Sequence, residues 1–141
     1  MAHDLTRFVA AQDGVYPQAL AELRAGAKRS HWMWFVFPQI AGLGHSAMAK
    51  TYAIADANEA RAYLAHPVLG ARLIEAIEAV TAAAGSAETI LGAIDAVKLR
   101  SSMTLFASVA DDPTPFHGAL DRFFGGTADP ATLERLRSVA R

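Results

Sequence analysis

The sequence of 141 residues contains no cysteine. It therefore has no disulfide framework, no thiolate zinc site and no cysteine nucleophile. It also has no large excess of charge of either sign, because 13 Lys and Arg stand against 14 Asp and Glu, a net charge of −1. Proteins that coat nucleic acid need many cations to displace counterions from phosphates, so this balance argues against such a partner.

Long apolar runs are missing as well. The richest stretch, residues 32–37, has six residues, far short of the about 18 that cross a bilayer. The first residues lack a basic segment followed by an apolar one, which is the pattern of a secretory signal. We therefore expect a cytoplasmic location and no membrane partner.

Apolar content is what the sequence has in quantity: 52% of its residues are hydrophobic and 19% are charged. Disordered chains are too polar to offset their ordering entropy, and this composition excludes that class. For this length, surface scaling gives a folded surface of roughly 7,000 Å², with about two thirds of the unfolded surface buried. We expect one compact domain over residues 1–141, with leftover apolar surface that favours a homodimer.

Residues that typically begin or end helices recur along the chain. Asp56, followed three residues later by Glu59, predicts a helix start, as do a Thr-Pro pair at 114–115 and an Asp-Pro pair at 129–130. Apolar residues repeat every three or four positions in 69–80. Strict apolar–polar alternation is absent, so the sequence predicts an all-α fold of seven or eight short helices.

Residues 32–37, Trp-Met-Trp-Phe-Val-Phe, are the one segment whose composition also suits a buried strand. The sequence offers it no partner strand, and a lone strand leaves its backbone groups unpaired. We therefore predict a buried helix that ends at Pro38.

The segment 28–39 holds both tryptophans beside two cations and a histidine. The simplest interpretation places the aromatic rings in the core and the cations on its solvated rim. The functional interpretation is that Arg29 and His31 face a cleft whose base is formed by Trp32 or Trp34. A planar ring would stack there while an anion meets the guanidinium.

Two neutral residues of the same segment complete this interpretation. Ser30 is placed to cap the following helix, whose free N–H groups would also favour an anion. Gln39 would supply a neutral hydrogen bond to the ligand.

A second polar cluster lies within a predicted helix. Lys98, Ser101 and Ser102 share one face, and small hydroxyls beside a lysine are a poor choice for a plain core. The structural explanation is that Asp95, three residues earlier, pairs with Lys98. The functional one is that this face, with Arg100 nearby, lines the same cleft.

Patterns for metal binding and for common hydrolytic chemistry are absent from the sequence. His3, His66 and His117 are scattered without partners at ligand spacing, so we expect no metal and no cofactor. There is no Gly-x-Ser-x-Gly elbow, and the apolar segments hold no closely spaced carboxylate pair. His31, with an ordinary pKa of about 6.5, is the one candidate for a catalytic acid or base.

Four stretches together resemble the bacterial family catalogued as domain of unknown function 1810: residues 7–12, 29–39, 59–70 and 98–106. The resemblance implies an all-helical single domain and does not supply an activity. The calpastatin label sometimes attached to that family does not fit, because calpastatins are long, polar and disordered. The resemblance also groups the segments at His31-Trp32 and at 98–104, which we expect to meet in space with Arg7 or Gln12 nearby.

Three hypotheses follow. The first is a binding site for a small planar anion, such as a nucleotide or a phosphorylated metabolite. The second is an enzyme acting on such a ligand through His31, and the third is an interaction module that uses the aromatic segment. The candidate ligand-binding residues are Arg29, Trp32, Trp34, Gln39, Lys98, Arg100, Ser101 and Ser102.

Overall fold

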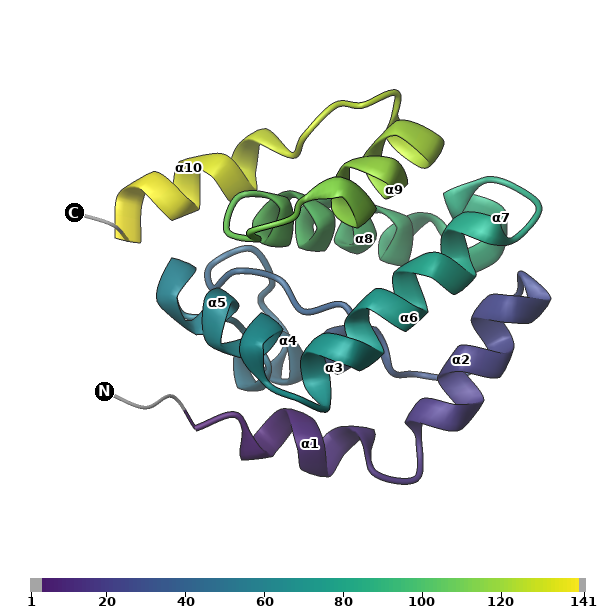
Figure 1. The fold of residues 1–141 in the computed structure, drawn as a ribbon, viewed down its shortest axis with the longest axis horizontal. Helices are drawn as coiled ribbons and strands as arrows, with labels where there is room; N and C mark the ends of the chain where they lie inside the picture. Colours follow the sequence, from purple (N-terminus) through teal and green to yellow (C-terminus); the bar gives the residue numbers. More distant parts are fainter. Residues whose placement is uncertain (1–3, 140–141) are drawn as a thin grey trace.

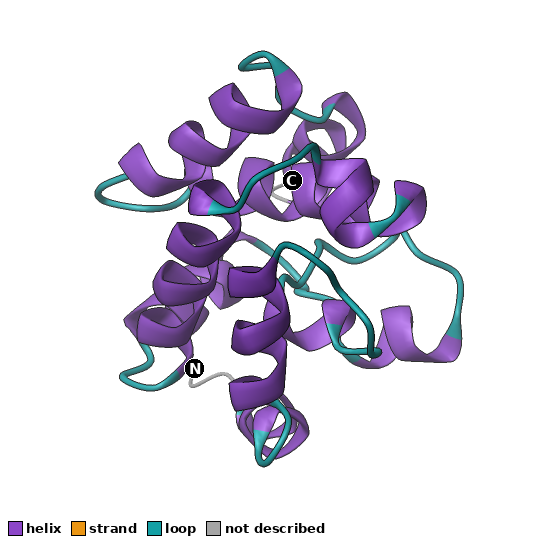
Figure 2. Cartoon of the chain, turned by 90° about the vertical axis from the view of Figure 1, so that its right-hand side faces the viewer, coloured by secondary structure: helices purple, strands orange, loops and turns teal. Residues whose placement is uncertain are grey.

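The computed structural model describes residues 4–139, which form ten helices and no strand (Figure 1, Figure 2). The all-α prediction is confirmed. The count exceeds the expected seven or eight, and three of the ten helices, α3, α4 and α7, are single turns of four or five residues. The helices are α1 (Thr6–Gln12), α2 (Tyr16–Ala25), α3 (Met33–Val36), α4 (Ala47–Thr51), α5 (Ala57–Ala65), α6 (Leu69–Ala82), α7 (Ala87–Leu91), α8 (Ala93–Ala107), α9 (Thr114–Phe124) and α10 (Pro130–Val139).

The helix ends follow from local capping. The Asp56 side chain accepts a hydrogen bond of 2.8 Å from the Glu59 N–H and opens α5. Ser86 opens α7 with a capping box. Gly26 and Gly125 end α2 and α9 in the left-handed conformation, which glycine adopts without a steric penalty.

Helix α6 runs through the middle of the molecule and contacts α2, α3, α5 and α9 (Figure 1). Helices α7, α9 and α10 pack on α8, and α1 packs on α3. The exposed surface of 7032 Å² is close to the value expected for a compact chain of this length. In the part of the chain that the structure describes, no helix is both long and apolar enough to cross a membrane.

A row of aromatic rings links four helices through the core. Phe8 of α1 meets Tyr63 of α5 edge to face at 5.1 Å between centroids. Tyr63 lies 5.4 Å from Phe106 of α8, and Phe106 stacks at 5.9 Å on Phe116 of α9. All four side chains are almost fully enclosed. Aromatic contacts of this kind add to the stabilisation from area burial alone.

The aromatic segment 32–37 is core. As predicted, it forms a helix, α3, that ends before Pro38. Every residue of the segment except Trp34 is buried, and Trp34 is half-buried. The segment therefore offers only Trp34 at the surface, and an interaction module that uses the whole aromatic segment stays a prediction.

Residues 41–53 form a loop, carrying α4, that is closed by a single parallel bridge between Ile40 and Ile54. The Ala41 N–H donates to the Ile54 carbonyl at 2.8 Å, and the Ile54 N–H donates to the Gln39 carbonyl at 2.9 Å. Both isoleucines are buried, so the bridge ties the loop to the core.

Two arginines from opposite ends of the chain hold this loop. Arg7 of α1 donates to the carbonyl oxygens of Thr51 and Ala53, each at 2.9 Å. Arg135 of α10 donates to the Ala41 carbonyl at 3.1 Å. The first and last helices are therefore joined through a loop that lies between them in sequence.

Candidate functional site

Glu22 of α2 organises the loop that precedes α3. Its carboxylate accepts hydrogen bonds from the backbone N–H groups of Arg29 and Ser30, at 2.8 and 3.1 Å. It also accepts from the Ser30 hydroxyl at 2.7 Å, from the Trp32 indole N–H at 2.9 Å and from the Gln18 amide at 3.1 Å. One side chain thus fixes the course of residues 29–32.

These contacts overturn two expectations. Ser30 does not cap the following helix: its hydroxyl bonds Glu22, and α3 begins only at Met33. Trp32 does not floor a cleft, because its side chain is fully enclosed and its indole N–H is used by Glu22. Trp34 is the tryptophan that remains accessible.

The Glu22 contacts also predict a pH effect. Burial raises the pKa of the Glu22 carboxyl, but the hydrogen bonds from the 29–32 loop and from Gln18 outweigh burial and lower the pKa to about 2. Because the ordinary value is 4.5, this carboxylate stabilises the fold above that pH, and the stabilisation is lost as the pH falls toward 2.

We therefore expect the free energy of unfolding to fall more steeply between about pH 5 and about pH 3 in the native chain than in Glu22→Gln, which has no carboxyl to titrate. Urea unfolding followed by circular dichroism measures both slopes. Equal slopes would contradict the role given to Glu22.

Four residues form what we term the lysine–tryptophan cluster: Lys28, Trp34, Asp95 and Lys98. The Asp95 carboxylate lies 2.9 Å from the Lys28 ammonium and 3.3 Å from the Lys98 ammonium. The Lys98 ammonium also lies 5.1 Å above the Trp34 ring, a cation–π contact. The two segments that the sequence grouped together therefore meet here.

The cluster carries an excess of positive charge. Two ammonium groups share one carboxylate, which leaves one positive charge uncompensated within the cluster. The three charged side chains are only 9%, 22% and 16% exposed, for Lys28, Lys98 and Asp95. Charges at this burial interact more strongly than they do on an open surface. The arrangement therefore favours an additional anion beside Lys98.

A shallow hollow of about 390 Å³ borders the cluster. It is lined by residues 91–95, where α7 meets α8, and Asp95 belongs to both the hollow and the cluster. The hollow is mostly apolar, and the exposed side chain of Ile94 stands in it. A ligand bound there would lie against the first turn of α8. It would also be close to the Asp95 carboxylate and to the two lysine ammonium groups that pair with it.

Arg29 and His31 are exposed, and within residues 4–139 neither side chain has a hydrogen-bond or ion-pair partner. Arg29 directly follows Lys28 of the cluster. Gln39 lines a different small cavity of about 130 Å³, together with Lys50. Gln39 thus has no contact that joins it to the cluster, while Arg29 stays a candidate for the anion.

Arg100 and Ser101 bind the segment that leads into α10. Arg100 donates to the carbonyl oxygens of Thr127 and Ala128, each at 2.9 Å. Ser101 is buried and donates to the Asp129 carboxylate at 3.1 Å. These two expected ligand residues are occupied in fixing α10 on α8, so we remove them from the candidate site.

Ser102 has a different environment. It is fully buried, and its hydroxyl has no hydrogen-bond partner among the described residues. A buried hydroxyl without a partner is uncommon, because it loses the hydrogen bonds of water. Being enclosed, Ser102 does not face a ligand at the surface, so the expectation that it lines a cleft is also wrong.

Gln12 lies next to the aromatic segment, whereas Arg7 does not. The buried Gln12 amide donates to the Phe35 carbonyl at 2.8 Å and to the Tyr63 hydroxyl at 3.2 Å. Burial raises the pKa of Tyr63, so its hydroxyl stays protonated. Arg7 instead binds the loop before α5 and pairs with Glu59 at 3.1 Å. Both side chains therefore connect parts of the fold and do not face a ligand site.

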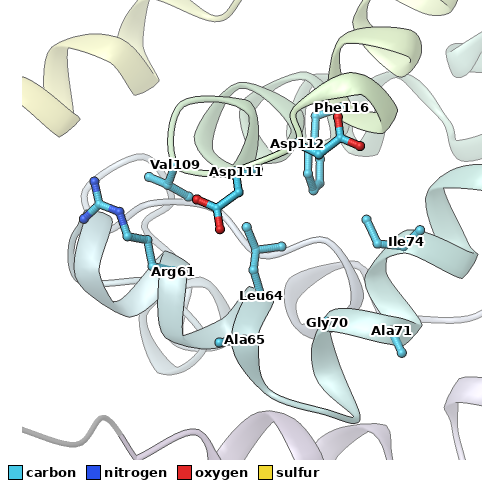
Figure 3. A pocket seen from close by; sticks show the side chains of 11 residues that line it. Arg61, Leu64, Ala65, Gly70, Ala71, Ile74, Val109, Asp111, Asp112 and Phe116 are labelled. Carbon is cyan, nitrogen blue, oxygen red and sulfur yellow. The ribbon is translucent and has the colours of Figure 1, made fainter.

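A larger concavity lies elsewhere and was missed at the level of sequence. We term it the α5–α9 groove; it has a volume of about 510 Å³ and opens between the α5–α6 corner and the start of α9 (Figure 3). Its residues are Arg61, Leu64, Ala65, Gly70, Ala71, Ile74, Val109, Ala110, Asp111, Asp112 and Phe116. In sequence its apolar residues are indistinguishable from core positions.

Within residues 4–139 no three His, Asp or Glu side chains stand close enough together to hold a metal ion. His3 lies outside the described residues. His31 has no described neighbour that would orient it as an acid or base. No observation therefore favours the enzyme hypothesis.

Comparison with known proteins gives one family and one solved structure. A family model described as "Protein of unknown function (DUF1810)" matches residues 2–136. The chain is similar to the conserved hypothetical protein Rv1873 from Mycobacterium tuberculosis, at 50% identity and a TM-score of 0.93. The match covers 95% of this chain and 96% of that one. No curated protein matches the chain.

Proposed function

The chain belongs to the DUF1810 family, and we propose that it binds a small anionic molecule that carries a planar ring at the lysine–tryptophan cluster. The observation that carries this proposal is the sharing of one carboxylate, Asp95, by two ammonium groups beside a half-buried tryptophan. The ligand class is that of nucleotides and phosphorylated metabolites.

The charge balance supports an anion. Lys28 and Lys98 are two of the three lysines in the sequence, and both point at one carboxylate. A phosphate beside Lys98 would restore the balance and would form charge-assisted hydrogen bonds. Arg29, exposed and without a partner among the described residues, is the second group that would meet the phosphate.

The position of Trp34 supports a ring on the ligand. Lys98 covers one face of the indole and the residue is only half-buried, so part of the ring system faces solvent. The neighbouring hollow of about 390 Å³ falls in the size range of small-ligand sites. The ring would lie against Trp34 and the apolar first turn of α8.

ADP, adenosine and pyrophosphate separate the two parts of this proposal. We expect ADP to bind more tightly than either part alone, to change the tryptophan fluorescence of the protein, and to bind more weakly as salt is added. At about 100 times its dissociation constant, ADP should raise the free energy of unfolding by about 2.7 kcal/mol in thermal denaturation.

Lys98→Gln should weaken ADP binding about tenfold, because it removes one charge-assisted contact. Asp95 keeps Lys28 as a partner in this variant, so the fold is expected to persist. Lys50→Gln, the same change at an exposed lysine of α4, is the matched control and should leave binding unchanged. Equal affinity in the two variants, or no response to any probe, would refute the proposal.

A further inference from the structure

The α5–α9 groove has the walls of a small-molecule site. Leu64 of α5, Ile74 of α6 and Phe116 of α9 surround it, and Val109 closes one side (Figure 3). Its volume of about 510 Å³ lies within the range of pockets that hold small ligands. Leu64, Ile74 and Val109 are only partly buried, so they keep apolar surface that an apolar ligand would cover.

The charge at the rim of the groove is negative. Asp111 and Asp112 stand at its upper edge and Arg61 at its side, so two carboxylates and one guanidinium belong to the rim. Arg61 binds Asn58 at 2.9 Å, and its guanidinium is turned outward in Figure 3. The groove therefore differs in sign from the lysine–tryptophan cluster.

The two carboxylates are not equivalent. Asp112 accepts a hydrogen bond of 3.1 Å from the Thr114 N–H at the start of α9, and its contacts with Thr114 lower the pKa of this carboxyl. Asp111 is exposed and, among residues 4–139, has no hydrogen-bond or ion-pair partner. Asp111 is thus the charge that remains available to a ligand in the groove.

We propose that the α5–α9 groove binds an organic cation, a molecule with an apolar body and a terminal ammonium group. The body lies between Leu64, Ile74 and Phe116, and the ammonium lies beside Asp111. Molecules that end in a carboxylate or phosphate are disfavoured, because both rim aspartates repel them. This site is independent of the anion site, with which it shares no residue.

Three probes that differ only in their end group test the charge preference: 4-phenylbutylamine, 4-phenylbutanol and 4-phenylbutanoate. Titration into ¹⁵N-labelled protein at neutral pH gives affinities from the amide shifts of groove residues such as Ala71 and Val109. We expect the amine to bind at least about fivefold more tightly than the alcohol, and the acid to bind most weakly.

Asp111→Asn should reduce the preference for the amine, because only Asp112 then remains charged at the rim, whereas Asp13→Asn, the same change at an exposed aspartate after α1, should retain it in full. Ala71→Leu, at an exposed position that lines the groove, should weaken all three probes by filling it. Equal affinity for the three probes, or no shift of groove amides at about 10 mM amine, would overturn the proposal.

Discussion

Replacing Glu22 with alanine should lower the free energy of unfolding by about 3 kcal/mol, measured by urea denaturation. The change removes the acceptor of five hydrogen bonds from Gln18 and the 29–32 loop. Water can replace the carboxylate at the partly exposed backbone groups, but it has no access to the Trp32 indole N–H, which is fully enclosed. That buried donor would be left without a partner.

Glu78→Ala is the matched control. Glu78 is an exposed glutamate of α6, and its side chain has no hydrogen-bond or ion-pair partner among residues 4–139. A change of less than about 0.5 kcal/mol is expected there. If the two variants lost the same stability, Glu22 would not be the organiser of the loop before α3.

Replacing Gly70 with alanine should destabilise the protein by about 3 kcal/mol. A Cβ atom at Gly70 would collide with the Leu64 carbonyl oxygen, where the last turn of α5 meets the first turn of α6. The opposing atom belongs to backbone inside a helix, so it cannot rotate away as a side chain would. The two helices would have to separate, and the midpoint of urea denaturation reports that loss.

Gly118→Ala provides the opposite result as a control. Gly118 lies within α9, and a Cβ atom there would meet nothing within 4 Å. Alanine is the better helix former, so this variant should gain about 0.5 to 1 kcal/mol. A loss at Gly118, or no loss at Gly70, would contradict the steric argument.

The fold could be predicted because its signals are local. The cap at Asp56, the Thr-Pro pair at 114–115 and the Asp-Pro pair at 129–130 fix helix starts from neighbouring residues alone. The aromatic segment was predicted correctly as a buried helix because its backbone had no partner strand. Helix α3 has a single turn, too short to show a period, so it was predicted from its composition and the following Pro38.

The site could be predicted only in part. The meeting of the segment at His31-Trp32 with residues 98–104 was expected from the resemblance of both stretches to one family, and the structure brings Lys98 over the nearby Trp34. Which tryptophan would be accessible depends on Glu22, a glutamate in the middle of a helix whose role nothing in the sequence signals. Likewise, Arg100 and Ser101 have the right chemistry for a ligand but are bound by a segment 27 or 28 residues away.

The α5–α9 groove shows a different limit. A groove exists where apolar side chains fail to cover one another, and that depends on how the α5–α6 corner stands relative to α9. Leu64, Ile74 and Val109 follow the same periodicity whether or not a neighbour covers them. No pattern in the sequence separates a core leucine from one that lines an open site.

The clamp of Arg135 on the Ala41 carbonyl has a consequence for protein synthesis. The two residues are 94 positions apart, so the ribosome must add most of the chain after residue 41 before this contact can form. Arg7 can hold the 51–53 end of the loop much earlier. A nascent chain that still lacks α10 therefore has only Arg7 and the Ile40–Ile54 bridge to hold this loop, and the contact of Arg135 forms once α10 has been synthesised.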